Sequence, residues 1–283
     1  MARLHHELLT SQGAAVRGYL MLTHGIFGSG GNWRSIARKV HRARPDLGCV
    51  LVDLRNHGKS DSPPPPHDLA ACADDVGELA GELAGQGVRL VAAAGHSFGG
   101  KVMATLRQRR ARHPGASQIA QWWMLDASPS ARPLAFSEPH NSVRQVLETL
   151  ESLPPRFASR EAFEAALTAA DQPRALAQWL AQNLEPADEG LRSRLPLPAV
   201  RQMLESYYAA DLWPSALDPA GGDLHVVVAE RSSTLSVADR AALRVAPPHL
   251  RSHAIDADHW LHIEAPDAVV ALLAEHLPRG ELA

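Results

Sequence analysis

The stretch AAAGHSFGG, residues 92–100, places Ser97 among glycines at the end of an apolar run. That run, VRLVAAA, precedes the serine, and a helix-like segment, KVMATLRQRR, follows it. In this context the pattern G-x-S-x-G predicts a tight turn between a strand and a helix, which lifts the Ser97 hydroxyl out of the carboxyl edge of a sheet. Such a turn needs small neighbours, and Gly95, Gly99 and Gly100 supply the space. A glycine-rich turn that holds a phosphate is the alternative interpretation.

Short apolar runs bounded by turn residues recur along the chain, with helical stretches between them. Most of the runs show little alternation, which is typical of strands covered on both faces of a parallel sheet. The runs are YLMLTHG (19–25), CVLVDLR (49–55), VRLVAAAG (88–95), WWMLDAS (122–128), LHVVVAE (224–230) and RSHAIDA (251–257). Strand then helix, repeated, predicts an α/β fold with a doubly wound, mostly parallel sheet. The opening LHHELLT is a candidate for an extra edge strand.

Residues 132–215 interrupt this alternation. They contain no clear strand and consist of helical segments cut by prolines. We therefore expect a core whose first part is 1–131, a helical lid inserted at 132–215, and a second part of the core at 216–283. A fully separate domain is the alternative for the insert.

Composition narrows the class of partner. The 283 residues carry a formal charge of −3, with acidic and basic residues mixed, so we expect neither a nucleic acid nor a membrane as partner. A small molecule is the expected ligand. Two cysteines, Cys49 and Cys72, are too few for a disulfide framework, and no segment has the pattern of a signal peptide or a membrane span. These features favour a cytoplasmic protein, whereas the sequence does not indicate its oligomeric state.

A serine hydroxyl is a poor nucleophile at neutral pH and needs a base to accept its proton. The chain has 15 histidines, and His259 is the candidate because it follows the last apolar run and precedes an amphipathic terminal helix. A serine followed by a histidine near the C-terminus is the chain order of this kind of site. We expect His262, three residues after His259, to lie on a different side from His259, and His24 and His96 to be structural.

The loop THGIFGSGGNW is a candidate for stabilising negative charge on a substrate oxygen. Two preorganised N–H donors are needed, and the amide of Phe98 is one candidate. The glycines of the loop let its backbone amides turn inward, with Ile26 as the favoured second donor and Phe27 as the alternative. A phosphate-binding loop is the competing interpretation, although the segment lacks the spacing of nucleotide-binding loops.

The motifs HGIFGSGGNW, DLRNHGKS, GHSFGGK, LDASP and DHWLHIEAP, in this order, resemble those of the α/β-hydrolase superfamily, and more narrowly those of small bacterial YbfF-type esterases. The resemblance covers the sheet domain on both sides of the insert. It implies ester or thioester hydrolysis without a cofactor, with Ser97 and His259 as the catalytic pair. It also implies that the amides of Ile26 and Phe98 bind the oxyanion.

The acid that orients His259 departs from the commonest pattern of the superfamily, in which an aspartate follows the penultimate strand. Here Ser232 or Ser233 falls at that place. Other hydrolases that the subgroup resembles take the acid from the end of the preceding strand, where WWMLDASP carries Asp126. We therefore favour Asp126, with Glu230 as the chief rival and Asp239 as a remote one.

Several further residues are candidates for contact with a substrate. Phe27 and Trp260 are the expected substrate-binding residues. Asp53 and Arg55, in DLRNHGKS, are expected to make structural polar contacts, although Arg55 could instead contact an acidic substrate group. Most of the aromatic side chains of the insert are expected to form its own core, although they could instead line an acyl pocket: Phe157, Phe163, Trp179, Tyr207, Tyr208 and Trp213.

The sequence thus predicts a carboxylesterase-type serine hydrolase that cleaves small to medium acyl esters or thioesters through an acyl-enzyme intermediate. It predicts neither a metal nor a cofactor. The same residues could also cleave a carbon–carbon bond, an amide or a lactone, or transfer an acyl group. A small-molecule receptor or binding module without turnover is the alternative of another class.

Overall fold

A sheet of seven strands forms the centre of the computed structural model, which describes residues 1–11, 13 and 15–279. The strand order is β1-β3-β2-β4-β5-β8-β9. The strands are β1 (His6–Leu9), β2 (Gly18–Thr23), β3 (Leu47–Val52), β4 (Leu90–His96), β5 (Gln121–Leu125), β8 (Asp223–Ala229) and β9 (Leu250–Ile255). Only β1 runs antiparallel to its neighbour, and the other adjacent pairs are parallel. The predicted α/β sheet and its extra edge strand are therefore confirmed, while residues 280–283 of the predicted second core segment lie outside the described residues.

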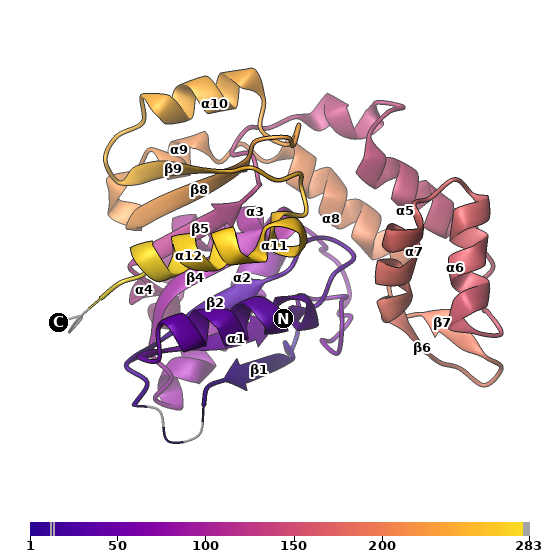
Figure 1. The fold of residues 1–283 in the computed structure, drawn as a ribbon, viewed down its shortest axis with the longest axis horizontal. Helices are drawn as coiled ribbons and strands as arrows, with labels where there is room; N and C mark the ends of the chain where they lie inside the picture. The colour runs from indigo at the N-terminus through magenta and orange to yellow at the C-terminus, as the bar shows by residue number, and fades with distance from the viewer. Residues whose placement is uncertain (12, 14, 280–283) are drawn as a thin grey trace.

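Helices cover both faces of this sheet (Figure 1). The helices α1 (Arg34–Ala43) and α12 (Pro266–His276) pack on one face. The helices α2 (Leu69–Gly85), α3 (Phe98–Arg109) and α10 (Val237–Arg244) pack on the other. Strand β5 is covered on both faces, which explains why its sequence does not alternate between polar and apolar residues. Trp122 packs in the core on the side of α2, α3 and α10, Trp123 packs in the core on the side of α1 and α12, and both are fully buried.

The segment 132–215 is helical but also contains a small hairpin. Its longer helices are α5 (Ser142–Ser152), α6 (Arg160–Ala169), α7 (Arg174–Leu180) and α8 (Leu197–Ala209). The prediction that it contains no clear strand was wrong, because β6 (Leu184–Pro186) and β7 (Leu191–Ser193) pair antiparallel. Strands of three residues are too short to show an alternating pattern. In Figure 1 the hairpin and α5, α6 and α7 lie together beside the sheet domain.

Both ends of this insert are attached to the same place on the sheet domain. The main chain of Arg132 donates to Tyr208 O at 2.7 Å. The buried ammonium of Lys101, on α3, donates to the carbonyl oxygens of Ser130, Tyr207 and Ala210 at 2.9, 2.8 and 2.9 Å. Since α3 begins directly after Ser97, the insert is anchored on the helix that follows the candidate nucleophile.

Short helical elements complete the described chain. They are η1 (Gly30–Trp33), η2 (Arg110–Arg112), α4 (Pro114–Ser117), η3 (Pro133–Ser137), η4 (Ala181–Asn183), α9 (Trp213–Ala216), η5 (Pro219–Gly221) and α11 (Leu261–Glu264). Across the described residues, every helix is too short or too polar to cross a membrane.

Candidate active site

Ser97 occupies a tight turn between β4 and α3. Its backbone has φ 51°, in the left-handed region that a serine seldom adopts. The turn leaves no space beside it, because a Cβ added at Gly95 would lie 2.2 Å from the backbone of Gly99. A Cβ added at Gly99 would lie 2.5 Å from the carbonyl oxygen of His24. These close approaches explain why the sequence around Ser97 needs glycine.

His259 lies next to Ser97 although 162 positions separate the two residues. It follows β9 at the carboxyl edge of the sheet, and its Nε2 is 3.1 Å from Ser97 Oγ. The His96 ring packs against the His259 ring with centroids 4.7 Å apart, and His96 Nε2 donates to the carbonyl oxygen of His259 at 2.8 Å. His262 packs against His96 and Trp33.

Asp126 lies on the other side of the His259 ring. Its Oδ2 is 2.7 Å from His259 Nδ1, and the side chain is completely buried. Two more groups donate to this carboxylate: the amide of Ala229 to Oδ1 at 3.2 Å, and the hydroxyl of Ser232 to Oδ2 at 2.6 Å. Thr234 Oγ1 lies 3.1 Å from His259 Nδ1. These contacts compensate for the cost of burying a charged carboxylate and fix its direction.

The rival acids lie elsewhere. Glu230 is exposed, and its amide continues the sheet by donating to Ile255 O at 2.9 Å. Asp239 accepts from the hydroxyls of Ser128 and Ser130 and caps the start of α10. The structure therefore brings Asp126 to His259, and neither rival.

The loop after β2 passes beside Ser97. A Cβ added at Gly25 would lie 3.5 Å from Ser97 Cβ. The amide of Gly28 donates to Gly25 O at 3.0 Å, which closes a turn with Ile26 and Phe27 at its centre. The amide of Phe27 already donates to His57 Nε2 at 3.3 Å, so this alternative donor is engaged within the protein. Ile26 is thus the candidate that the geometry favours, together with Phe98 at the first position of α3, where helix amides lack intrahelical partners.

Two buried histidines join this loop to the loop after β3. His24 Nδ1 donates to Gly25 O at 2.7 Å, while its Nε2 accepts from the amide of Leu54 at 3.0 Å. His57 makes the reciprocal contacts: its Nδ1 donates to Arg55 O at 2.9 Å and its Nε2 accepts from Phe27. Burial lowers the pKa of both rings, that of His57 to about 3. Both histidines therefore remain neutral and keep one acceptor nitrogen each.

Asp53 and Arg55 make structural contacts, as expected. Asp53 accepts from the amides of Gly30 and Lys59 at 2.6 and 2.8 Å. Arg55 forms a buried ion pair with Asp75 at 2.5 Å, which leaves its charge already matched.

Of the two expected substrate-binding residues, Phe27 is 4% exposed and Trp260 is half-buried. The Trp260 ring packs edge to face on Trp179 of α7, with centroids 4.7 Å apart, so it joins the site to the insert. Their contact with a substrate stays a prediction.

Tyr207 is a site residue that the sequence did not single out, because it was expected to belong to the core of the insert. It is indeed buried, and its ring centroid lies 6.0 Å from that of Phe98. Its ring therefore lies beside the residue whose amide is a candidate oxyanion donor. Burial raises the pKa of Tyr207, with a smaller contribution from Tyr208, so the phenol stays protonated. Helical spacing cannot distinguish a tyrosine in the core of the insert from one that packs beside the site.

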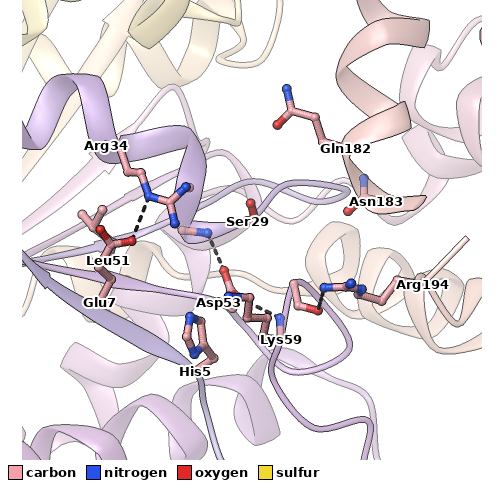
Figure 2. A pocket seen from close by; sticks show the side chains of 13 residues that line it. His5, Glu7, Ser29, Arg34, Leu51, Asp53, Lys59, Gln182, Asn183 and Arg194 are labelled. Carbon is pink, nitrogen blue, oxygen red and sulfur yellow. Dashed lines mark hydrogen bonds and ion pairs between the residues drawn. The ribbon is translucent and has the colours of Figure 1, made fainter. Parts of the chain in front are cut away.

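A pocket of about 230 Å³ is lined by Ser29, Gly30 and Gly31, which follow the Gly25–Gly28 turn along the chain, and by Asn183 and Arg194 of the insert. Figure 2 shows Ser29, Asp53 and Asn183 on its walls, and neither Ser97 nor His259 lines it. Over residues 1–11, 13 and 15–279, no group of three or more histidine, cysteine or acidic side chains is arranged to hold a metal ion.

The sequence of this chain is similar to those of known hydrolases. A family model described as Alpha/beta hydrolase family matches residues 20–272. The sn-1-specific diacylglycerol lipase ABHD11 of Xenopus tropicalis is 26% identical over 250 residues, which cover 87% of this chain and 73% of that protein. The same lipase of Danio rerio is 28% identical over 254 residues, covering 87% and 74%.

Solved structures show the same fold. A marine microorganism esterase superposes with a TM-score of 0.79 at 23% identity, covering 98% of this chain and 100% of that one. E-2-(Acetamidomethylene)succinate hydrolase superposes with a TM-score of 0.71 at 23% identity, covering 91% and 90%. At this level of identity the two structures support the fold alone.

Proposed function

The chain belongs to the alpha/beta hydrolase family, and from that premise we propose that it is a serine esterase acting through an acyl-enzyme intermediate. The observation that carries the proposal is the continuous chain of hydrogen bonds from Ser97 through His259 to Asp126. This complete series of hydrogen bonds also argues against a receptor without turnover. The narrower resemblance to YbfF-type esterases stays a prediction.

In the first half of the proposed reaction, His259 Nε2 accepts the proton of Ser97 as its oxygen attacks the ester carbonyl. The resulting oxyanion accepts hydrogen bonds from the amides of Ile26 and Phe98. Collapse of this intermediate breaks the bond to the leaving alkoxide, which takes the proton from His259. The acyl group is then bonded to Ser97.

In the second half, His259 accepts a proton from water, and the hydroxide attacks the acyl-enzyme. The oxyanion forms again at the same two amides, Ser97 leaves and recovers its proton from His259, and the acid is released. Throughout, Asp126 holds the ring with Nδ1 protonated and stabilises the imidazolium that forms. A buried acceptor only 2.7 Å from Nδ1 suits this role.

For the substrate we propose uncharged acyl esters of small to medium length, with thioesters as a second class. The curated relatives are named as diacylglycerol lipases, which supports a glycerolipid ester among the candidates. Arg55, the arginine weighed as an alternative contact for an acidic substrate group, is paired with Asp75, and this favours a neutral substrate. A panel of p-nitrophenyl esters, coenzyme A esters and diacylglycerols, each of graded chain length, would rank these classes.

The proposal is tested by labelling with a fluorophosphonate, which reacts with activated serines. We expect the wild-type protein to be labelled and to hydrolyse p-nitrophenyl esters, and Ser97→Ala to lose both properties. Labelling and turnover that persist in folded Ser97→Ala would refute the proposal, and absence of both in the wild-type protein would favour a binding module.

A further inference from the structure

The direction of the Ile26 amide depends on the carbonyl group of Gly25. The two groups belong to one planar trans peptide, in which the C=O and N–H bonds point in opposite directions. Gly25 O accepts from His24 Nδ1 at 2.7 Å and from the amide of Gly28 at 3.0 Å. These bonds orient the peptide, and the Gly28 bond exists only while the turn is closed.

The closed turn requires Phe27 to adopt φ 65°, which is unfavourable for a large side chain. Such a conformation persists only where its surroundings hold it. Two side chains do so here: His57 Nε2 accepts from the Phe27 amide at 3.3 Å, and Asn183 Nδ2 donates to the Phe27 carbonyl at 2.8 Å. His57 comes from the sheet domain, whereas Asn183 comes from the insert.

Asn183 is well placed to hold this loop. It is the last residue of η4, its side chain is 7% exposed, and Nδ2 also donates to Leu180 O at 3.3 Å. The main-chain carbonyl oxygen of Asn183 accepts from the main-chain amide of Arg194 at 2.9 Å, and Arg194 Nη1 donates to Gly58 O at 2.8 Å. In Figure 2 Asn183 and Arg194 lie on the insert side of the pocket, opposite Asp53.

We propose that Asn183 is a positioning residue through which the insert, residues 132–215, holds the turn that aims the Ile26 amide at the oxyanion. This inference rests on the proposed esterase function. Asn183 acts through the Phe27 carbonyl and does not touch the substrate. The insert thereby contributes to the stabilisation of the transition state, besides any role in covering the site.

The test compares kcat, KM and inhibitor affinity in Asn183→Asp and Asn183→Ala. Asn183→Asp keeps the shape but replaces the donor with an acceptor that faces the Phe27 carbonyl, and Asn183→Ala removes the donor without adding a charge. The matched control is Asn141→Asp in the same insert, which loses the bonds from Nδ2 to Ala135 O and to the Tyr208 hydroxyl but keeps the helix cap at Oδ1.

Complete loss of an oxyanion donor costs roughly 10²- to 10³-fold in kcat, and a misdirected donor should cost part of that. We expect kcat for a p-nitrophenyl ester to fall about 10-fold or more in both Asn183 variants, with KM nearly unchanged, and the control to keep the wild-type kcat. A trifluoromethyl ketone, whose adduct carries an oxyanion, should bind more weakly by the same factor, whereas the matching methyl ketone should bind equally well.

Wild-type kcat in folded Asn183→Ala, or a fall in kcat with undiminished affinity for the trifluoromethyl ketone, would overturn the inference while leaving the proposed function intact. Absence of turnover in the wild-type protein would instead overturn the function on which the inference depends. Unfolding temperatures of all variants identify any loss that is due to misfolding.

Discussion

The hydroxyl of Ser232 donates a 2.6 Å hydrogen bond to Oδ2 of Asp126, the same oxygen that faces His259. Ser232 follows β8, at the place where many superfamily members carry the acid itself. In the proposed mechanism the acid is Asp126, which lies one strand earlier, after β5, and Ser232 donates to it from the segment after β8. The segments that follow these two neighbouring strands would then orient His259 together.

Replacing Asp126 tests the assignment of the acid. Asp126→Asn keeps the shape but presents His259 with the wrong hydrogen-bonding pattern, and we expect kcat for p-nitrophenyl acetate to fall roughly 10³- to 10⁴-fold. Glu230→Gln is the matched control, because Glu230 is exposed, and it should leave kcat unchanged. The opposite pattern would transfer the role of acid to Glu230.

Replacing Ser232 tests its support of the acid. Ser232→Ala removes one hydrogen bond to a buried carboxylate, an interaction worth about 1.5–3 kcal/mol, so we expect kcat to fall roughly 10- to 150-fold. The adjacent exposed Ser233 provides the control, and Ser233→Ala should behave as the wild-type protein does. Equal kcat in the two variants would show that the Ser232 contact does not serve the reaction.

Tyr207 and Tyr208 form a second matched pair. Tyr207→Phe retains the ring beside Phe98 but removes a phenol whose pKa is raised by burial and lowered slightly by the Ser97 hydroxyl, so we expect kcat/KM to fall about 3- to 10-fold, as for the loss of one hydrogen bond. The hydroxyl of Tyr208 accepts from Asn141 Nδ2 at 2.9 Å, away from Ser97, and Tyr208→Phe should affect stability alone. Steady-state kinetics of both variants would reveal a difference, and equal values would remove Tyr207 from the site.

Lys101 should make stability depend on pH. Burial lowers its pKa from 10.5 to about 7, with a smaller contribution from Arg132. Between these values the unfolded chain binds more protons than the folded one, so the free energy of unfolding rises with pH in this window and is lower near pH 7.

Urea unfolding of the wild-type protein and of Lys101→Met at pH 7 and pH 9 measures this contribution. The wild-type protein should gain about 2 kcal/mol more than the variant between the two pH values. Lys101→Met should also be less stable overall, because three carbonyl groups, one buried and two partly buried, lose their donor. Identical pH slopes would mean that Lys101 keeps an ordinary pKa.

Much of the fold could be predicted because buried parallel strands leave a strong signal. The runs that became β2, β3, β4, β5 and β8 are almost wholly buried, whereas the edge strand β9 is largely exposed between its buried ends. The glycines around Ser97 reflect backbone contacts that admit no Cβ. The hairpin of β6 and β7 was missed because its strands, Leu184–Pro186 and Leu191–Ser193, carry no periodic pattern. Its pairing depends on contacts within the folded insert.

The candidate site was predictable where a residue follows a recognisable strand. Ser97, Asp126 and His259 each stand at the end of such a strand, and they meet because the carboxyl ends of parallel strands share one edge. The supporting residues gave no comparable signal. Thr234 lies in a loop and Asn183 in the insert, and both contact the site only because of how these segments fold. Their positions in the sequence do not indicate these contacts.

The most direct test of the whole account is to mix the protein rapidly with p-nitrophenyl acetate, follow p-nitrophenol release before the steady state, and locate the acetyl group by mass spectrometry. The account predicts release coupled to acetylation of Ser97, with neither event in Ser97→Ala. Acetylation at another residue, or wild-type turnover by Ser97→Ala, would contradict it.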